Sequence, residues 1–215
     1  VTSGTITATI TEQDTDTLAG IDRVGAYTIT VANTTAEDPD TEAEELVEPV
    51  LATALTAINA LTTETINVTA STITGDIADV TTAFVTNNSD YTFASDVAIT
   101  LDDATSIDEL NAITDLTTGT VTATMDAAIS LEDYVSTTDG SLTIASGNAL
   151  TITLDDAAEV DASDVITLID ATTVSIEFSE AAPVITGTLA ELTSIYASHN
   201  ACLLYTSDAA DDANC

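Results

Sequence analysis

The stretch TLDDATSIDELNAITDLTTGTVTATM, residues 100–125, predicts a strand, a short helix and a second strand in immediate succession. In residues 119–125, Val, Ala and Met alternate with Thr, which is the period-two pattern of a strand that buries one face. Thr is β-branched, so it suits the extended backbone on the exposed face. We therefore expect Val121, Ala123 and Met125 to lie in a core and the threonines between them to face solvent.

The helix in this stretch is short and amphipathic. Ile107, Leu110 and Ile113 recur at helical spacing, and Ser106 with Glu109 forms a capping-box pattern just before them. A helix of two or three turns is too short to persist alone in water, so it must rest on the sheet. Similar start signals occur elsewhere, namely a second capping box at Thr188 and Glu191 and candidate N-caps at Asp76 and Asp161.

Strands of this kind recur along the chain in two interleaved families. The first family comprises residues 4–10, 64–70, 119–125 and 173–179, and the second comprises residues 27–33, 97–103 and 150–156. Helix candidates follow them at residues 16–26, 53–63, 75–84, 106–118, 129–137, 161–173 and 187–196. The pattern predicts repeat units at residues 1–63 (with an acidic insertion at 33–50), 64–118 and 119–172, and a partial unit at 173–201.

Strand–helix alternation with short connections favours a parallel sheet. Because the units are tandem and similar, we expect an α/β repeat fold: a β/α solenoid with parallel strands and short helices, in which each coil buries its neighbour's apolar face. In outline this arrangement resembles a leucine-rich-repeat protein. The alternative is a string of small β-rich domains. Strand-like pieces at residues 91–95 and 141–146 fit a single sheet poorly, and residues 33–50 are expected to be a solvated loop with a short helix at 41–48.

The composition excludes several classes of function. The chain has 37 acidic residues and one basic side chain, Arg23, which gives a formal charge of −36. Such a surface repels phosphate backbones and anionic lipid, so neither nucleic-acid binding nor electrostatic attachment to a membrane is expected. No run of residues approaches the roughly 20 apolar residues of a membrane span, so membrane insertion is not expected either. Lys is absent, which rules out a P-loop, and His199 is the only histidine, which rules out a His-based triad or metal cluster. Since 45% of the residues are hydrophobic, the chain should nevertheless fold, and we expect no enzyme activity.

Calcium is the candidate ligand, and no other cofactor is expected. The LDDA sequences place adjacent carboxylates, Asp102 with Asp103 and Asp155 with Asp156, where a strand is expected to end in a turn. Ca²⁺ prefers such oxygen ligands, yet no EF-hand loop or calcium-binding nonapeptide occurs, and Asp is also a common turn and cap residue. Stacked Thr rows, as at Thr120 and Thr122, raise the further alternative of an ice-binding surface, although Asn67, Ala98 and Glu177 interrupt the rows.

Both ends of the sequence look incomplete or foreign. Val1 is not an initiator methionine, so we expect an interior fragment of a longer, environmentally sampled protein. Residues 202–212, CLLYTSDAADD, resemble the translation of a transposase sequencing adapter, so residues 202–215 are interpreted as an artefactual tail. Both cysteines lie in this tail, and cysteine usage therefore says nothing about the redox compartment.

The segments SIDELNAITDLTTGTVTATM and ALTITLDDA, together with their copies between about residues 50 and 180, resemble the Thr/Ala/Asp-rich tandem repeats of very large secreted or cell-surface bacterial proteins of the adhesin-like type. This resemblance implies a non-enzymatic structural or adhesive segment in an extracellular or cell-surface protein, acting as an acidic spacer. Its partners would be neighbouring repeats of the same chain and divalent cations. The alternative is a ligand-binding module for Ca²⁺, glycan or ice.

Overall fold

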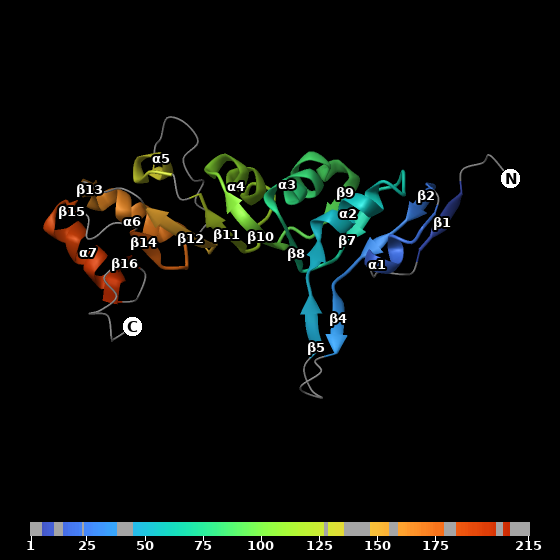
Figure 1. The fold of residues 1–215 in the computed structure, drawn as a ribbon, viewed down its shortest axis with the longest axis horizontal. Helices are drawn as coiled ribbons and strands as arrows, with labels where there is room; N and C mark the ends of the chain where they lie inside the picture. The colour runs from blue at the N-terminus through green and yellow to red at the C-terminus, as the bar shows by residue number, and fades with distance from the viewer. Residues whose placement is uncertain are drawn as a thin grey trace. The chain divides into compact units, whose positions relative to one another are not determined.

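The computed structural model describes residues 6–10, 15–22, 24–37, 45–126, 129–135, 147–154, 159–178, 184–200 and 204–206. The chain is a mixed α/β protein in which short parallel strands alternate with short helices (Figure 1). The helices are α1 (Thr15–Leu18), α2 (Ala52–Asn59), α3 (Ile77–Val80), α4 (Ile107–Thr114), α5 (Leu131–Val135), α6 (Ala162–Ala171) and α7 (Leu189–Asn200). Helix α3 continues into a π-helical turn, Thr81–Thr86, and a 3₁₀ turn follows at Asn88–Asp90.

The residues fall into two compact units by their contacts. Unit 1 comprises Val1–Asp102 with Asp115–Gly119, and unit 2 comprises Asp103–Thr114 with Thr120–Cys215. The strands of unit 1 are β1 (Thr7–Thr9), β2 (Ala26–Thr28), β3 (Thr30–Val31), β4 (Thr34–Glu37), β5 (Glu45–Glu48), β6 (Val50–Leu51), β7 (Ile66–Val68), β8 (Thr72–Gly75) and β9 (Tyr91–Phe93). Unit 2 contains β11 (Val121–Met125), β12 (Ala149–Leu154), β13 (Glu159–Asp161), β14 (Ile176–Phe178), β15 (Val184–Thr186) and β16 (Leu204–Thr206), and β10 (Ala98–Thr105) has residues in both units.

Successive strand segments within each unit pair in parallel, as the alternation of strands and helices predicts. In unit 1, β6, β8 and β10 pair in this way, as do β3, β7 and β9. In unit 2, β11, β12, β14 and β16 pair in parallel, and β13 pairs with β15. The parallel strands follow the order β10-β8-β6 in unit 1 and β16-β14-β12-β11 in unit 2. The expected parallel α/β class is therefore confirmed.

The core consists of small aliphatic side chains from alternate strand positions and from one side of each helix. Val121, Ala123 and Met125 are buried and the threonines between them are exposed, as the period-two pattern predicts. Ile107, Leu110 and Ile113 of α4 are also buried. The pattern is weaker in β1, where the apolar face is only partly covered and Ile6, just before it, is 46% exposed.

The predicted helix starts are confirmed by hydrogen bonds. Ser106 and Glu109 form a reciprocal capping box, in which the Ser106 N–H donates to Glu109 Oε2 at 3.1 Å and the Glu109 N–H donates to Ser106 Oγ at 3.4 Å. Thr188 and Glu191 form the second box. Asp76 and Asp161 accept from backbone N–H groups of the first helical turn of α3 and α6. Local sequence therefore determines where these helices begin.

The structure corrects two expectations about local structure. The segment expected to hold a short helix at 41–48 contains β5, which pairs antiparallel with β4, so the described part of the insertion is a β-hairpin. The helix expected at 16–26 is only the single turn α1. Cross-strand backbone hydrogen bonding within the hairpin outweighs the weak helical preference of a Glu-rich segment, because so short a helix has little stability alone.

The remaining expectations have different outcomes. The strand-like piece at 91–95 forms β9, which joins the separate three-stranded sheet β3-β7-β9. The piece at 141–146 lies outside the described residues. The repeat boundaries at residues 63, 118 and 172 stay a prediction. In the part of the chain that the structure describes, no helix has the length and apolar character needed to cross a membrane.

Candidate functional site

The structure describes two of the four carboxylates predicted to bind Ca²⁺. Asp102 and Asp103 lie inside β10 and not in a turn, because the strand continues beyond them. Both side chains are exposed, and the Thr74 hydroxyl donates to Asp102 Oδ1 at 3.2 Å. Asp155 and Asp156 lie outside the described residues. Calcium binding at these four positions stays a prediction.

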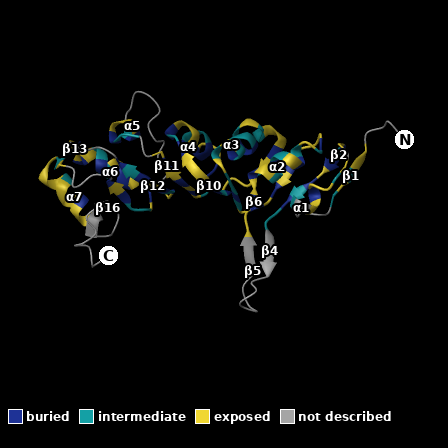
Figure 2. Ribbon diagram, viewed as in Figure 1, coloured by how far each residue is buried: buried dark blue, intermediate teal, exposed yellow. Residues whose placement is uncertain are grey.

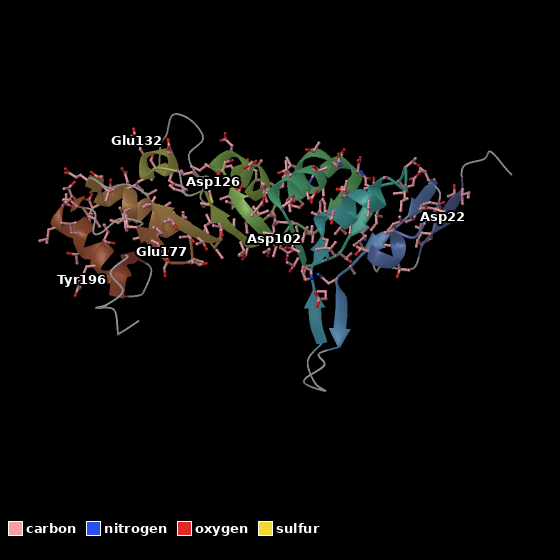
Figure 3. All side chains as sticks on the ribbon, in the orientation of Figure 1. Asp22, Asp102, Asp126, Glu132, Glu177 and Tyr196 are labelled. Carbon is pink, nitrogen blue, oxygen red and sulfur yellow. The ribbon has the colours of Figure 1, made fainter. Side chains whose placement is uncertain are left out.

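The acidic side chains are dispersed over the described surface. Figure 3 labels carboxylates on separate elements, among them Asp126 after β11, Glu132 on α5 and Glu177 on β14. Among the residues described, no three His, Cys, Asp or Glu side chains gather closely enough to hold a metal ion, and no Asp or Glu is buried. The described carboxylates therefore contribute a diffuse negative potential.

A small polar pocket of about 190 Å³ lies in unit 1 beside the C-terminus of α2. It is lined by Asn59, Thr62, Thr63, Glu64, Thr65 and Asp90. The Asn59 amide donates to Asp90 Oδ2 at 2.9 Å, so one carboxylate already has a protein partner. The pocket has the chemistry of a weak cation or water site and contains no nucleophile–base pair.

The predicted Thr rows are interrupted where strands pair. Thr124 lies beside Thr151 in the β11–β12 register, but Thr122 lies beside Ala149. In the β12–β14 register Thr153 lies beside Glu177. A methyl and hydroxyl grid for ice would need matching residues on neighbouring strands. The register thus makes the rows irregular, as the interrupting residues suggested.

Three buried threonines make the most regular side-chain contacts in the described chain. Thr62, Thr117 and Thr172, here called the bridging threonines, follow α2, α4 and α6 and are 55 residues apart. Each hydroxyl donates to the backbone carbonyl of the first residue of a second-family strand segment. Thr62 donates to Tyr27 at 2.8 Å, Thr117 to Val97 at 2.6 Å and Thr172 to Leu150 at 2.8 Å.

The bridging threonines also accept hydrogen bonds. Each hydroxyl oxygen accepts from the backbone N–H two residues further along the chain, at 2.9–3.1 Å. Thr62 and Thr172 accept in addition from the N–H groups of Tyr27 and Leu150, at 3.0 and 2.9 Å. A single hydroxyl therefore satisfies several buried backbone groups where a helix returns to the sheet.

The residue after each bridging threonine also makes a recurring contact. The backbone N–H groups of Thr63, Thr118 and Thr173 donate to the carbonyl oxygens of Gly25, Ser95 and Asn148, at 3.0, 2.7 and 2.8 Å. Each acceptor lies two residues before the residue whose carbonyl the bridging threonine bonds. The sequence signal is the Thr-Thr pair that ends the helix candidates at 53–63, 106–118 and 161–173. Sequence reasoning assigned these pairs to the helices and so missed their role between elements.

A second recurring contact joins the end of a strand to the preceding helix. A Cβ on Gly75 would stand 3.2 Å from the Ala52 Cβ, and a Cβ on Gly187 would stand 2.5 Å from the Ala162 Cβ. Ala52 and Ala162 are the first residues of α2 and α6, and both are buried. Glycine therefore permits a close approach of strand and helix at corresponding places in the two units.

Four of the tyrosines differ in their surroundings. Tyr27, Tyr91 and Tyr134 are buried, whereas Tyr196 is 66% exposed. The Tyr91 hydroxyl donates to the Leu55 carbonyl at 3.0 Å, but the buried Tyr134 hydroxyl has no hydrogen-bond partner among the described residues. Burial raises the pKa of both Tyr91 and Tyr134, and a neighbouring aspartate adds to each shift. Both phenols therefore stay neutral and are structural groups.

The caps shift the pKa of their carboxyl groups in different directions. Hydrogen bonds from the Ser106 side chain and backbone lower the pKa of Glu109, and those from Ser163 lower the pKa of Asp161. Loss of hydration, followed by repulsion from Asp76, raises the pKa of Asp79. Each shift follows from helix-start geometry and not from a catalytic arrangement.

No protein-family model, curated protein or solved structure matches this chain. Its function must therefore be inferred from the contacts described above.

Proposed function

We propose that the chain is a non-enzymatic structural segment built of tandem β/α repeats, which serves as an acidic spacer in a large extracellular or cell-surface protein. The observation that carries this proposal is the recurrence of the bridging threonines, with the same backbone contacts at Thr62, Thr117 and Thr172. A scaffold repeats its internal contacts, whereas a catalytic site needs one particular arrangement. In this proposal the repeats form a β/α solenoid.

The polar residues that make repeated contacts have structural roles in the proposal. Thr hydroxyls satisfy backbone groups between elements, Ser, Thr and Asp cap helices, and glycines admit close backbone approach. These roles account for part of the chain's Thr and Asp content. The described side chains that remain are mainly exposed Thr and carboxylates.

The charge of the surface supports a spacer. At a formal charge of −36, neighbouring copies of the chain repel each other, which opposes self-association and non-specific contact with other acidic surfaces. A spacer needs such a surface because it must hold attached parts apart without binding them. This reasoning also favours the spacer over the adhesive role, which would need a patch able to attract a partner.

A reach measurement tests the proposed function. One, two or three copies of residues 64–172 are placed between a surface anchor and a reporter domain, and the height of the reporter is measured by fluorescence. A solenoid spacer raises the reporter by equal steps with each copy. A Gly/Ser linker of equal length is the matched control, because the reach of a flexible chain grows roughly as the square root of its length. Reporter heights that follow the control would contradict the spacer.

An unfolding experiment separates the solenoid from a string of independent domains. In a solenoid each repeat buries its neighbours' apolar surface, so the unfolding midpoint rises as copies of residues 64–172 are added. Independent domains would unfold at one midpoint whatever their number. Urea titrations of the one-, two- and three-copy chains, followed by circular dichroism, distinguish the two architectures.

A further inference from the structure

Helix α7 is largely exposed to solvent (Figure 2), and some of its exposed residues are apolar. Leu189, Leu192 and Tyr196 are 83%, 37% and 66% exposed, and their spacing of three and four residues places them on one side of the helix. Ile195, in contrast, is buried, and α7 packs against α6. The helix therefore buries one side within unit 2 and exposes an adjacent apolar side.

Most of the corresponding positions in α3 and α5 are buried. The capping side chains before α3, α5 and α7 each accept from the N–H three residues further on. Counted from these caps, Leu189 corresponds to Leu131 in α5 and to Ile77 in α3, and Leu192 corresponds to Tyr134 in α5 and to Val80 in α3. Leu131, Tyr134 and Val80 are buried, as is Phe84 at the position of Tyr196, whereas Ile77 is half-buried.

In α5 the next helix along the chain is a packing partner. Helix α6 follows α5 and packs against it, and its Val165, Leu168 and Ile169 are buried. In the described chain no helix follows α7. The strand before α7 likewise has one edge without a described partner, since β15 pairs with β13 on one edge and no described strand lies on its other edge.

We infer that the α7 stripe (Leu189, Leu192 and Tyr196) and the edge of β15 away from β13 form a docking surface for a further strand–helix segment of the β13–α6 type. The occupant would have the apolar pattern of residues 159–171, EVDASDVITLIDA. Its strand would extend the β13–β15 pair in parallel, and its helix would pack on the stripe as α6 packs against α5. The attraction would be apolar, because residues 159–171 are acidic and α7 has no Lys or Arg.

This inference rests on the proposed repeat architecture, and the experiment separates the two. In the full chain, residues 202–215 are replaced by a second copy of residues 147–178, which places a new strand and helix at the 55-residue interval. Hydrogen exchange is then compared with that of the original chain. We expect the amides of α7 to exchange at least about tenfold more slowly in the extended chain, since docking removes local opening.

Two matched variants test the stripe itself. Leu189→Gln with Leu192→Gln should leave the melting temperature of the original chain unchanged, because both side chains are exposed there. In the extended chain the same pair should lower the melting temperature and abolish the added protection of α7. Val165→Asp with Leu168→Asp, made only in the added copy, should have the same effect from the partner's side.

Several outcomes would overturn the inference. These are unchanged exchange in α7, an added copy whose amides exchange at random-coil rates, or an equal loss of stability from Leu189→Gln with Leu192→Gln in both chains. Dimerisation of the original chain that those substitutions abolish would identify a second copy as the occupant instead. If α7 stays unprotected while the midpoint still rises with copies of residues 64–172, the repeat architecture stands and only the docking surface is wrong.

Discussion

Replacing each bridging threonine with valine should destabilise the protein to an extent that its hydrogen bonds determine. Valine keeps the shape of threonine and replaces the hydroxyl with a methyl group. Thr62→Val removes a bond to the Tyr27 carbonyl and bonds from the Tyr27 and Glu64 N–H groups. A typical bond contributes about 1 kcal/mol and an unsatisfied buried group costs about 1–3 kcal/mol, so we expect a loss of about 3 kcal/mol.

The three sites should not be equal. Thr172→Val removes the same set of bonds around Leu150 and should also cost about 3 kcal/mol. Thr117→Val should cost less, about 1–2 kcal/mol, because the Val97 N–H has its own partner in the Ala94 carbonyl at 3.3 Å. The Thr117 hydroxyl also bonds the Ser95 carbonyl at 3.4 Å, but that carbonyl accepts from the Thr118 N–H as well. The ranking therefore follows from the buried backbone groups that depend on each hydroxyl alone.

Urea unfolding at constant ionic strength measures these losses, with hydrogen exchange near each site as a local readout. Thr122→Val is the control, because Thr122 is exposed on β11 and its substitution should change stability by less than about 0.5 kcal/mol. The reasoning is refuted if the bridging-threonine variants behave like the control. A loss at Thr117 equal to those at the other two sites would refute the ranking alone.

Three other expectations concern buried hydroxyls, acid stability and salt. Tyr134→Phe should leave stability unchanged or raise it by about 1 kcal/mol because the hydroxyl is buried without a partner, whereas Tyr91→Phe should lower it by about 1 kcal/mol; thermal melts of the two variants decide this. The pKa of Glu109 is lowered by Ser106, so its cap stabilises the protein above the ordinary Glu pKa and is lost as pH falls through the lowered value; Ser106→Ala should raise that pKa in an NMR titration, and an unchanged value would contradict the assignment. The melting temperature should rise between about 10 and 500 mM NaCl, and with millimolar Ca²⁺, as screening reduces carboxylate repulsion; a flat response to both would show that repulsion is not limiting.

Much of the local structure could be predicted from the sequence. The buried face of β11, the apolar side of α4 and the caps at Ser106 and Thr188 depend on residues within about four positions of each other, so short-range patterns suffice. The hairpin β4–β5 could not be predicted in this way, because pairing across the turn outweighs weak local preferences. The expected calcium carboxylates illustrate the same limit, since Asp102 and Asp103 lie within a strand that runs further than its pattern indicated.

The sequence by itself determined most of the alternation of strands and helices, the apolar side of elements such as β11 and α4, the capped helix starts and the acidic composition. These properties follow from backbone periodicity, local hydrogen bonding and charge, and all of them act over a few residues or over the whole composition. Only the tertiary structure decided which backbone groups Thr62, Thr117 and Thr172 satisfy, at separations of 35, 20 and 22 residues, and why Tyr134 is buried while Tyr196 is exposed. Those outcomes depend on which distant segments pack together, because a side chain's partner and its exposure are set by neighbours in space.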